Sequence, residues 1–154
     1  HMISRVTKEG SKWADPPAKF EAGTSPIAEA VGLGAAVDFL DEVGPEALWE
    51  HNRDIAAYAI ERLSEVPGLE IHGPRDERVA LVSFALEGIH PHDVAEILGR
   101  DNICVRAGHH CAQVLMDRLE IAATARASFG VYTTTEEIDR LVDGLEDARK
   151  VFGL

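Results

Sequence analysis

The stretch RAGHHCAQVLM, residues 106–116, places a thiol beside two imidazoles and a guanidinium. Gly108 interrupts the apolar run before it, and the spacing of apolar residues after Cys111 is helical. We therefore expect Cys111 at or next to a helix N-terminus, where unpaired N–H groups and the helix dipole favour a negative charge. The thiolate is the nucleophilic form of cysteine. These features alone fit a reactive cysteine and an inert, buried one equally well.

Two other kinds of thiol site find less support. Zinc ligands must converge as a tetrahedron, and three consecutive residues such as 109–111 rarely do so. The chain has no C-x-x-C and no H-x-x-x-H pattern, so we expect no metal site. A cysteine protease would need a distant histidine as base, and no pattern identifies one. The second cysteine, Cys104, lies between Ile103 and Val105 and is expected to fill core volume.

Two further residues have a structural and a functional interpretation. Arg126, in TARASFG, is either an exposed edge-strand arginine or a bidentate ligand for a carboxylate. His92, in HPHD, stands near an expected helix N-terminus, where it would serve as a cap or in a surface turn. Sequence position decides neither case.

The composition limits the classes of function. Of the 154 residues 45% are apolar, which is enough for a core, and 27 acidic against 15 basic residues give a net charge of −12. Such a surface repels phosphate backbones and anionic headgroups, so neither nucleic acid nor a membrane is an expected partner. No apolar run approaches the roughly 20 residues that cross a bilayer. Two cysteines seven residues apart do not form a disulfide framework, and a reducing cytoplasm is the expected location.

The elements that must position these residues can be read from periodicity and turn signals. A β-hairpin turning at residues 9–11 comes first, and a helix rich in small residues follows, capped by Thr24 or Ser25. Thr134 and Glu137 form a capping box for the last helix. The expected helices span 26–43, 46–66, 91–98 (ended by Gly99), 111–119 and a segment after 134; the expected later strands span 69–72, 79–86, 103–107 and 124–131. The order predicts an α+β domain with helices on one face of a small, mainly antiparallel sheet.

Several motifs together resemble one enzyme family. RAGHHCA is similar to the active-site loop of the SUF-type (group II) cysteine desulfurases and selenocysteine lyases of the class V aminotransferases. FEAGTSPIAEAVGLGAAVDFL (20–40), GIHPHDV (88–94) and RASFGVYTTTEEIDRLVDGL (126–145) match that family in order and spacing. The resemblance covers nearly the whole chain and implies the C-terminal part of a fold-type I pyridoxal-phosphate enzyme.

The resemblance also implies a division of the chain. Residues 1–24 would be a remnant of the large cofactor domain, 25–44 the connecting helix and 45–154 the complete C-terminal small domain. Family members are much longer, and none of the four lysines lies in a motif like that of their cofactor lysine. The fragment alone is therefore expected to be inactive.

Site residues follow from the resemblance position by position. Cys111 would take sulfur from L-cysteine as a persulfide, releasing L-alanine. Arg126 would bind the substrate carboxylate, with Arg106 and His110 lining the approach. Thr24, with Gly23 before it, matches a residue that contacts the cofactor phosphate of the other subunit in this dimeric family.

The implied partners are a sulfur-acceptor protein of the SUF system and a second copy of the full-length chain, in iron–sulfur cluster assembly. His92 would then be a ligand to the zinc of such an acceptor. Two alternatives remain open from the sequence: a stand-alone module that binds a partner without a cofactor, and a redox-sensing thiol protein.

Overall fold

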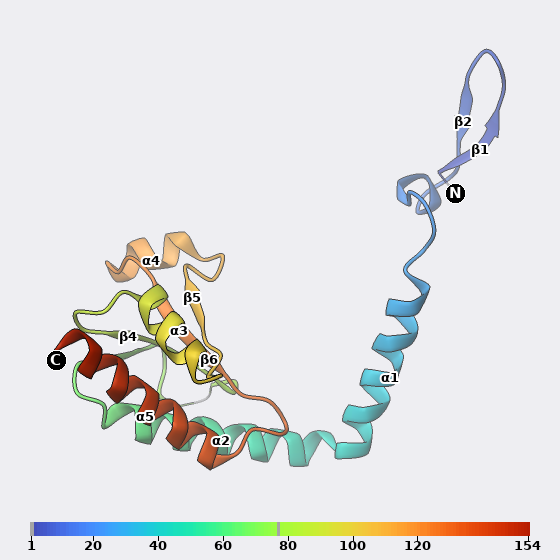
Figure 1. Ribbon diagram of the computed structural model, residues 1–154. Coiled ribbons are helices and arrows are strands. Elements are labelled where there is room, and N and C mark those ends of the chain that lie inside the picture. Colours follow the sequence, from blue (N-terminus) through green and yellow to red (C-terminus); the bar gives the residue numbers. More distant parts are fainter. Residues whose placement is uncertain (1, 77) are drawn as a thin grey trace. The chain divides into compact units, whose positions relative to one another are not determined.

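The computed structural model describes residues 2–76 and 78–154 (Figure 1). Two compact units make up the chain, His1–Gly44 and Pro45–Leu154. Among the described residues, no helix is both long enough and apolar enough to cross a membrane.

The first unit contains a hairpin and one long helix. Strands β1 (Ile3–Val6) and β2 (Ser11–Trp13) pair antiparallel, which confirms the predicted hairpin. A short 3-10 helix, η1 (Ala18–Phe20), precedes α1 (Ile27–Val43). The N-cap of α1 is Pro26, and no side chain caps it, so the expected cap by the two hydroxyl residues before it is wrong.

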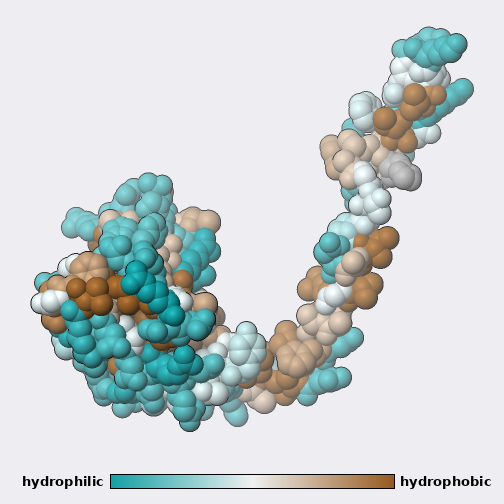
Figure 2. Space-filling model, in the orientation of Figure 1, coloured by the Kyte–Doolittle hydropathy of each residue, from teal (hydrophilic) through white to brown (hydrophobic). Residues whose placement is uncertain are grey.

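Helix α1 buries none of its 17 residues, although it is rich in large apolar side chains. Figure 2 shows such side chains on the surface of this helix. A Cβ at Gly32 or Gly34 would meet no described atom within 4 Å, so these small residues mark no close contact among the described residues. The exposed large apolar side chains of α1 are Ile27, Val31, Leu33, Val37, Phe39 and Leu40.

The second unit is built on a four-stranded antiparallel sheet with the strand order β3-β4-β6-β5. In that order the strands are Leu69–His72, Leu81–Leu86, Thr124–Ser128 and Arg106–Gly108. Burial alternates along β4, with Val82, Phe84 and Leu86 buried and their neighbours only partly so. One face of the sheet therefore belongs to the core.

Three helices cover that core face: α2 (Pro45–Ser64), α3 (Pro91–Arg100) and α5 (Thr135–Phe152). Helices α2 and α5 lie side by side (Figure 1). The observed order of elements and the antiparallel sheet confirm the predicted fold class. The most completely buried large side chains are Phe84, Leu63, Leu98, Ile138 and Leu145.

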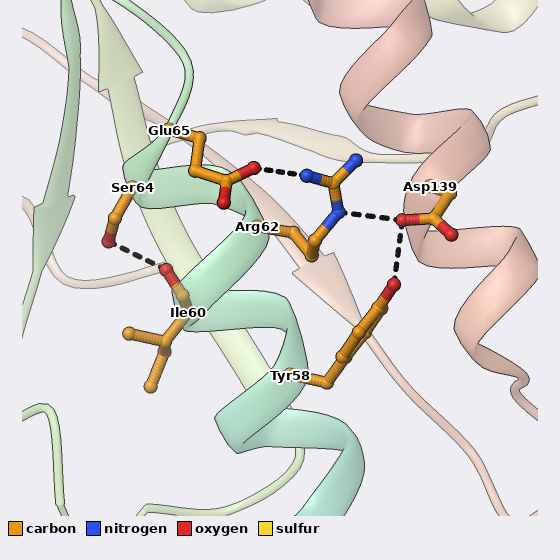
Figure 3. Close-up of polar contacts among 6 residues, drawn as sticks. All are labelled: Tyr58, Ile60, Arg62, Ser64, Glu65 and Asp139. Atoms are coloured by element: carbon orange, nitrogen blue, oxygen red, sulfur yellow. Dashed lines mark hydrogen bonds and ion pairs between the residues drawn. The ribbon is translucent and has the colours of Figure 1, made fainter.

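A polar cluster joins α2 to α5 at the edge of the core (Figure 3). Asp139 accepts hydrogen bonds from the Tyr58 hydroxyl at 2.9 Å and from Arg62 Nε at 2.7 Å, and Arg62 also pairs with Glu65. Hydrogen bonds from Arg62 and then from Tyr58 hold the pKa of Asp139 below its usual range. The predicted capping box of α5 is also present, since Thr134 and Glu137 bond reciprocally.

The short helix α4 (Gln113–Leu119) borders the opposite face of the sheet, where its residues line a pocket together with those of β4 and β6. The sequence predicted all helices on one face of the sheet. Helix α4 is the exception, because it lies at the other face. Its one buried residue is Met116.

Several expected element boundaries were wrong, among them the end of the strand expected over 124–131, because β6 stops at Ser128. Helix α3 continues past Gly99 to Arg100, and α2 ends at Ser64 rather than Val66. Strand β5 spans only 106–108, because the N–H of Ile103 bonds to the Leu98 carbonyl and extends the turn that follows α3.

Cys104 is exposed, against the expectation that it fills core volume. Ile103 and Val105 pack against the core instead, so the residue between them points outward. Side chains therefore alternate between the core and solvent along residues 103–105, and Cys104 faces solvent.

Candidate functional site

A row of four polar residues crosses the face of the sheet opposite the core. His72 is paired with Ser83, Ser83 with Arg126, and Arg126 with Arg106. Residues directly opposite one another in antiparallel strands project from the same face. The four strands thus present an imidazole, a hydroxyl and two guanidinium groups side by side.

The two arginines are the unusual members of this row. Like charges directly opposite each other destabilise a pair of strands. Neither Arg106 nor Arg126 forms an ion pair with a carboxylate among residues 2–76 and 78–154. An anion placed between the guanidinium groups would relieve this repulsion, because arginine binds carboxylate and phosphate through two parallel hydrogen bonds.

The loop after β5 brings Cys111 to this pair of arginines. The thiol is exposed, and Arg106 Nη2 lies 4.0 Å from Cys111 Sγ, within hydrogen-bond range for sulfur. His110 (φ 55°) and Cys111 (φ 61°) both adopt left-handed backbone conformations. Such conformations cost roughly 1–2 kcal/mol per non-glycine residue and are concentrated at functional sites.

Helix α4 starts later than expected. Ala112 is its N-cap and Gln113 its first residue, so Cys111 precedes the helix rather than beginning it. The expected position next to a helix start is confirmed, whereas the ionisation inferred from it stays a prediction.

His110 is fixed by a hydrogen bond between its Nε2 and the Thr124 hydroxyl, at 2.9 Å. Thr124 is almost completely buried at the start of β6. Burial lowers the pKa of His110, and the positive charges of Arg126 and Arg106 lower it further. The ring is therefore neutral at pH 7, and its Nδ1 is buried without a partner among the described residues.

A pocket of about 300 Å³ lies between the sheet and α4, and Cys111 and Arg106 stand outside its lining. Arg126 and His110 line it, and Leu115, Met116 and Leu119 form its apolar wall. The Nε of Arg126 is buried and has no hydrogen-bond partner among the described residues. A small molecule with an acidic group and a short apolar part would satisfy the arginine and fill the pocket.

The other predicted site residues lie elsewhere. Gly23 (φ 80°) and the exposed Thr24 belong to the first unit, in the segment before α1. His92 is exposed in the first turn of α3, and its backbone N–H donates to His90 Nδ1 at 3.2 Å. The side chain that caps α3 is therefore that of His90, and not that of His92 as the structural interpretation had it.

Sequence reasoning missed the participation of Thr124, Ser83 and His72. Their types carry no motif, and each becomes notable only once the strand register places it on the face of the sheet opposite the core. Among the described residues, no group of three or more His, Cys, Asp or Glu side chains is placed to hold a metal ion.

Comparisons with known proteins give this geometry a context. The family description aminotransferase class-V matches residues 1–141. The chain belongs to the class-V aminotransferase family. This confirms the predicted class-V aminotransferase family.

The similar members of the class-V aminotransferase family are cysteine desulfurases. A probable cysteine desulfurase of Halalkalibacterium halodurans is 51% identical over 99% of this chain and 37% of its own length. A cysteine desulfurase of Haloferax volcanii is 50% identical over 98% of this chain and 36% of its own length. The apo structure of a cysteine desulfurase from Thermococcus onnurineus NA1 superimposes with a TM-score of 0.83 at 38% identity, over 99% of this chain and 38% of that one. The chain thus spans little more than a third of the length of the relatives it matches.

Proposed function

We propose that the chain is the C-terminal part of a pyridoxal-phosphate-dependent cysteine desulfurase, in which Cys111 takes sulfur from L-cysteine and L-alanine is released. The observation that carries this proposal is the meeting of Arg106 and Arg126 on facing strands, with the exposed Cys111 thiol 4.0 Å from Arg106. A site of this kind holds an anionic substrate and presents a sulfur nucleophile to it.

Binding of the substrate begins at Arg126. Its planar guanidinium can grip the carboxylate of an amino acid at two points, which fixes the orientation of the rest of the molecule. Cys111 lies between His110 and Ala112, which both line the same pocket. A substrate carboxylate held by Arg126 therefore brings the substrate sulfur within reach of the loop that carries the thiol.

The transfer itself is a displacement at sulfur. Cys111 Sγ, as thiolate, bonds to the sulfur of L-cysteine, and the substrate C–S bond breaks. The electron pair of that bond goes to the substrate carbon, which takes up a proton and becomes the methyl group of L-alanine. The sulfur stays on Cys111 as a persulfide. Arg106 Nη2, 4.0 Å from Cys111 Sγ, places a positive charge beside the attacking sulfur.

Pyridoxal phosphate, when bound, supplies the electron sink for this chemistry. The residues of this chain fit the phosphate group of the cofactor, but they do not supply the lysine that binds it covalently. Thr24 offers an exposed hydroxyl and Gly23 an open backbone to a phosphate group, and among the described residues no lysine lines the pocket beside Arg126. We therefore propose that the lysine that binds the cofactor belongs to the longer enzyme, and that this chain alone is inactive.

The wider role rests on the resemblance of the site loop to the SUF type. We propose that the longer enzyme is a cytoplasmic homodimer that passes sulfur to a SUF acceptor protein for iron–sulfur cluster assembly. His92 is exposed on the first turn of α3, and we propose that it binds the zinc of that acceptor. His92→Ala should then slow sulfur transfer to the acceptor while alanine formation without acceptor stays unchanged; equal loss of both would contradict this role.

One experiment tests the reaction and the need for a longer chain together. After incubation with pyridoxal phosphate and removal of the unbound cofactor, the 154-residue chain should be colourless, and it should release no alanine from L-cysteine. The same chain preceded by the missing portion of the enzyme should absorb in the visible range and release alanine. Alanine release by the short chain, or none by the long one, would contradict the proposal.

A matched pair of substitutions tests the carboxylate site in the longer enzyme. Arg126→Lys keeps the positive charge but loses the bidentate geometry, so the KM for L-cysteine should rise about tenfold or more. Arg118→Lys alters an exposed arginine of α4 that does not line the pocket, and its KM should stay unchanged. Equal kinetics for the two variants would show that Arg126 does not bind the carboxylate.

A further inference from the structure

The pocket near Cys111 contains a third residue with an unpartnered polar atom, and the family resemblance does not assign a role to it. The side chain of His72 is only 10% exposed, and its Nε2 is buried without a hydrogen-bond partner among the described residues. Its other ring nitrogen, Nδ1, lies 3.8 Å from a carboxylate oxygen of Glu70. Burying a polar nitrogen without a hydrogen-bond partner destabilises the fold, so such groups call for an explanation.

The lining of this pocket is complementary to an anion. Three of the residues that line it, His72, His110 and Arg126, each have a buried side-chain nitrogen without a hydrogen-bond partner among the described residues. None of the described residues that form its wall is acidic, although the chain carries 27 acidic residues and a net charge of −12. An anionic group bound here would meet donors without meeting a carboxylate of the protein.

The strand register places His72 and Arg126 on either side of a short residue. His72, on β3, and Arg126, on β6, are both paired with Ser83 of β4, which lies between those strands. Their Cα atoms are therefore two strand spacings apart, roughly 10 Å. Ser83 rises little above the sheet between them. A carboxylate lying over Ser83 can accept hydrogen bonds of about 3 Å from both sides.

We infer that His72 is a specificity-determining residue of this site, whose Nε2 donates a hydrogen bond to the substrate carboxylate that Arg126 binds. The inference rests on the proposed function for the identity of the ligand, a small amino acid. It adds a second donor, from a strand on the other side of β4, to the arginine that the family resemblance identified. With both donors in place, the site selects a free carboxylate over an amide or ester.

Titration of the 154-residue chain with propionate, followed by ¹⁵N NMR of its side chains, tests this without cofactor or catalysis. Propionate should shift the His72 ring and Arg126 Nε resonances together and saturably, whereas propionamide, of the same shape without the charge, should shift neither. A shift at Arg126 alone, or at neither residue, would overturn the inference.

Substitutions sharpen the test. His72→Leu should weaken propionate binding about tenfold, the size expected for a lost hydrogen bond to a charged group. His72→Gln, whose amide can donate from nearly the same place, should keep most of the affinity. His51→Leu is the matched control, because the Nε2 of His51 is also buried and unpartnered among the described residues but lines a different pocket.

Unchanged affinity in His72→Leu, with thermal unfolding showing that the variant is folded, would overturn the inference. If that variant does not fold, His72→Gln and the ring resonances of the unaltered chain still decide the matter. The outcome is independent of sulfur transfer, since the titration involves neither the cofactor nor Cys111. Failure to form a persulfide would leave the carboxylate site standing, and failure of the titration would leave the persulfide chemistry standing.

Discussion

Phe84 and Phe39 are the same side chain in opposite surroundings. Phe84, on β4, is 0% exposed among residues of three helices and a sheet, whereas Phe39, on α1, is 51% exposed. The same contrast holds for the two units as wholes: the second has one continuous core, and the first buries no side chain among residues 2–44. A helix that is apolar on all sides belongs to the interior of a larger body.

The contrast shows where the chain is self-sufficient. The second unit closes its own core and builds the face that carries Arg126 and the Cys111 loop. The first unit carries apolar side chains that its own described residues leave exposed. Because the matched relatives are almost three times as long, we expect the rest of the longer enzyme to cover α1.

The largest expected effect comes from the phenylalanine pair itself. Phe84→Ala should lower the free energy of unfolding by about 3–5 kcal/mol, since it removes buried apolar area and leaves a cavity. Phe39→Ala should change it by less than about 0.5 kcal/mol. Urea unfolding of the 154-residue chain measures both, and a comparable loss in the two variants would show that α1 packs against something in this chain.

A glycine pair sharpens the comparison with a smaller effect. A Cβ at Gly144, in α5, would lie 2.6 Å from Leu98 Cδ2 and 3.0 Å from Ile103 Cδ1, so Gly144→Ala should destabilise by about 1–3 kcal/mol. A Cβ at Gly32, in α1, meets nothing within 4 Å, and alanine there should favour the helix by up to about 1 kcal/mol.

Circular dichroism and thermal unfolding follow the two effects of the glycine pair. Gly144→Ala should unfold at a lower temperature, and Gly32→Ala should be at least as helical as the original chain. Loss of helix in Gly32→Ala would mean that α1 already has a close neighbour at that position.

The smallest effect concerns the polar cluster that joins α2 and α5. Because the pKa of Asp139 is lowered in the folded state, its contribution to stability is present above about pH 4 and is lost as the pH falls further. Asp139→Asn lacks this contribution. The difference in stability between the original chain and the variant should be steady from neutral pH to about pH 5 and should shrink in more acidic solution.

Thermal unfolding across this pH range checks the prediction for Asp139. The difference should be small, since the carboxylate is 42% exposed and solvent screens it. Tyr58→Phe removes one of the two hydrogen-bond donors to Asp139. The difference in stability between the original chain and this variant should also shrink on acidification, but by less than for Asp139→Asn. A difference that grows on acidification would contradict the assignment.

Much of the fold could be predicted because its signals are local. The capping box at Thr134 and the β-rich run that forms β4 each depend on a few neighbouring residues. Both elements are present, although β4 begins at Leu81 and not at residue 79. The errors occurred where a distant contact decides. Strand β5 is shortened because the backbone of Ile103 completes the turn after α3, and Cys104 points outward because its two neighbours take the inward positions.

The residues of the candidate site also fall into those that a local motif reveals and those that only distant contacts bring to the site. Cys111, His110 and Arg106 stand close together in one motif, and Arg126 was recognised through the family resemblance. His72 could not be found from the sequence, because it reaches the pocket only through two successive strand pairings. A β-strand residue reveals its face from its neighbours, but the residues opposite it depend on the register of the whole sheet.

The two exposed thiols provide the most direct test of the proposed chemistry. Cys111 lies beside Arg106 at the pocket, and Cys104 lines a separate pocket of about 190 Å³. The longer enzyme, loaded with pyridoxal phosphate, should be treated with L-cysteine and its peptides analysed by mass spectrometry. The account predicts the added mass of one sulfur atom on the peptide of Cys111 and none on that of Cys104. Alanine formation with no added sulfur on Cys111, or undiminished alanine formation by Cys111→Ser, would contradict it.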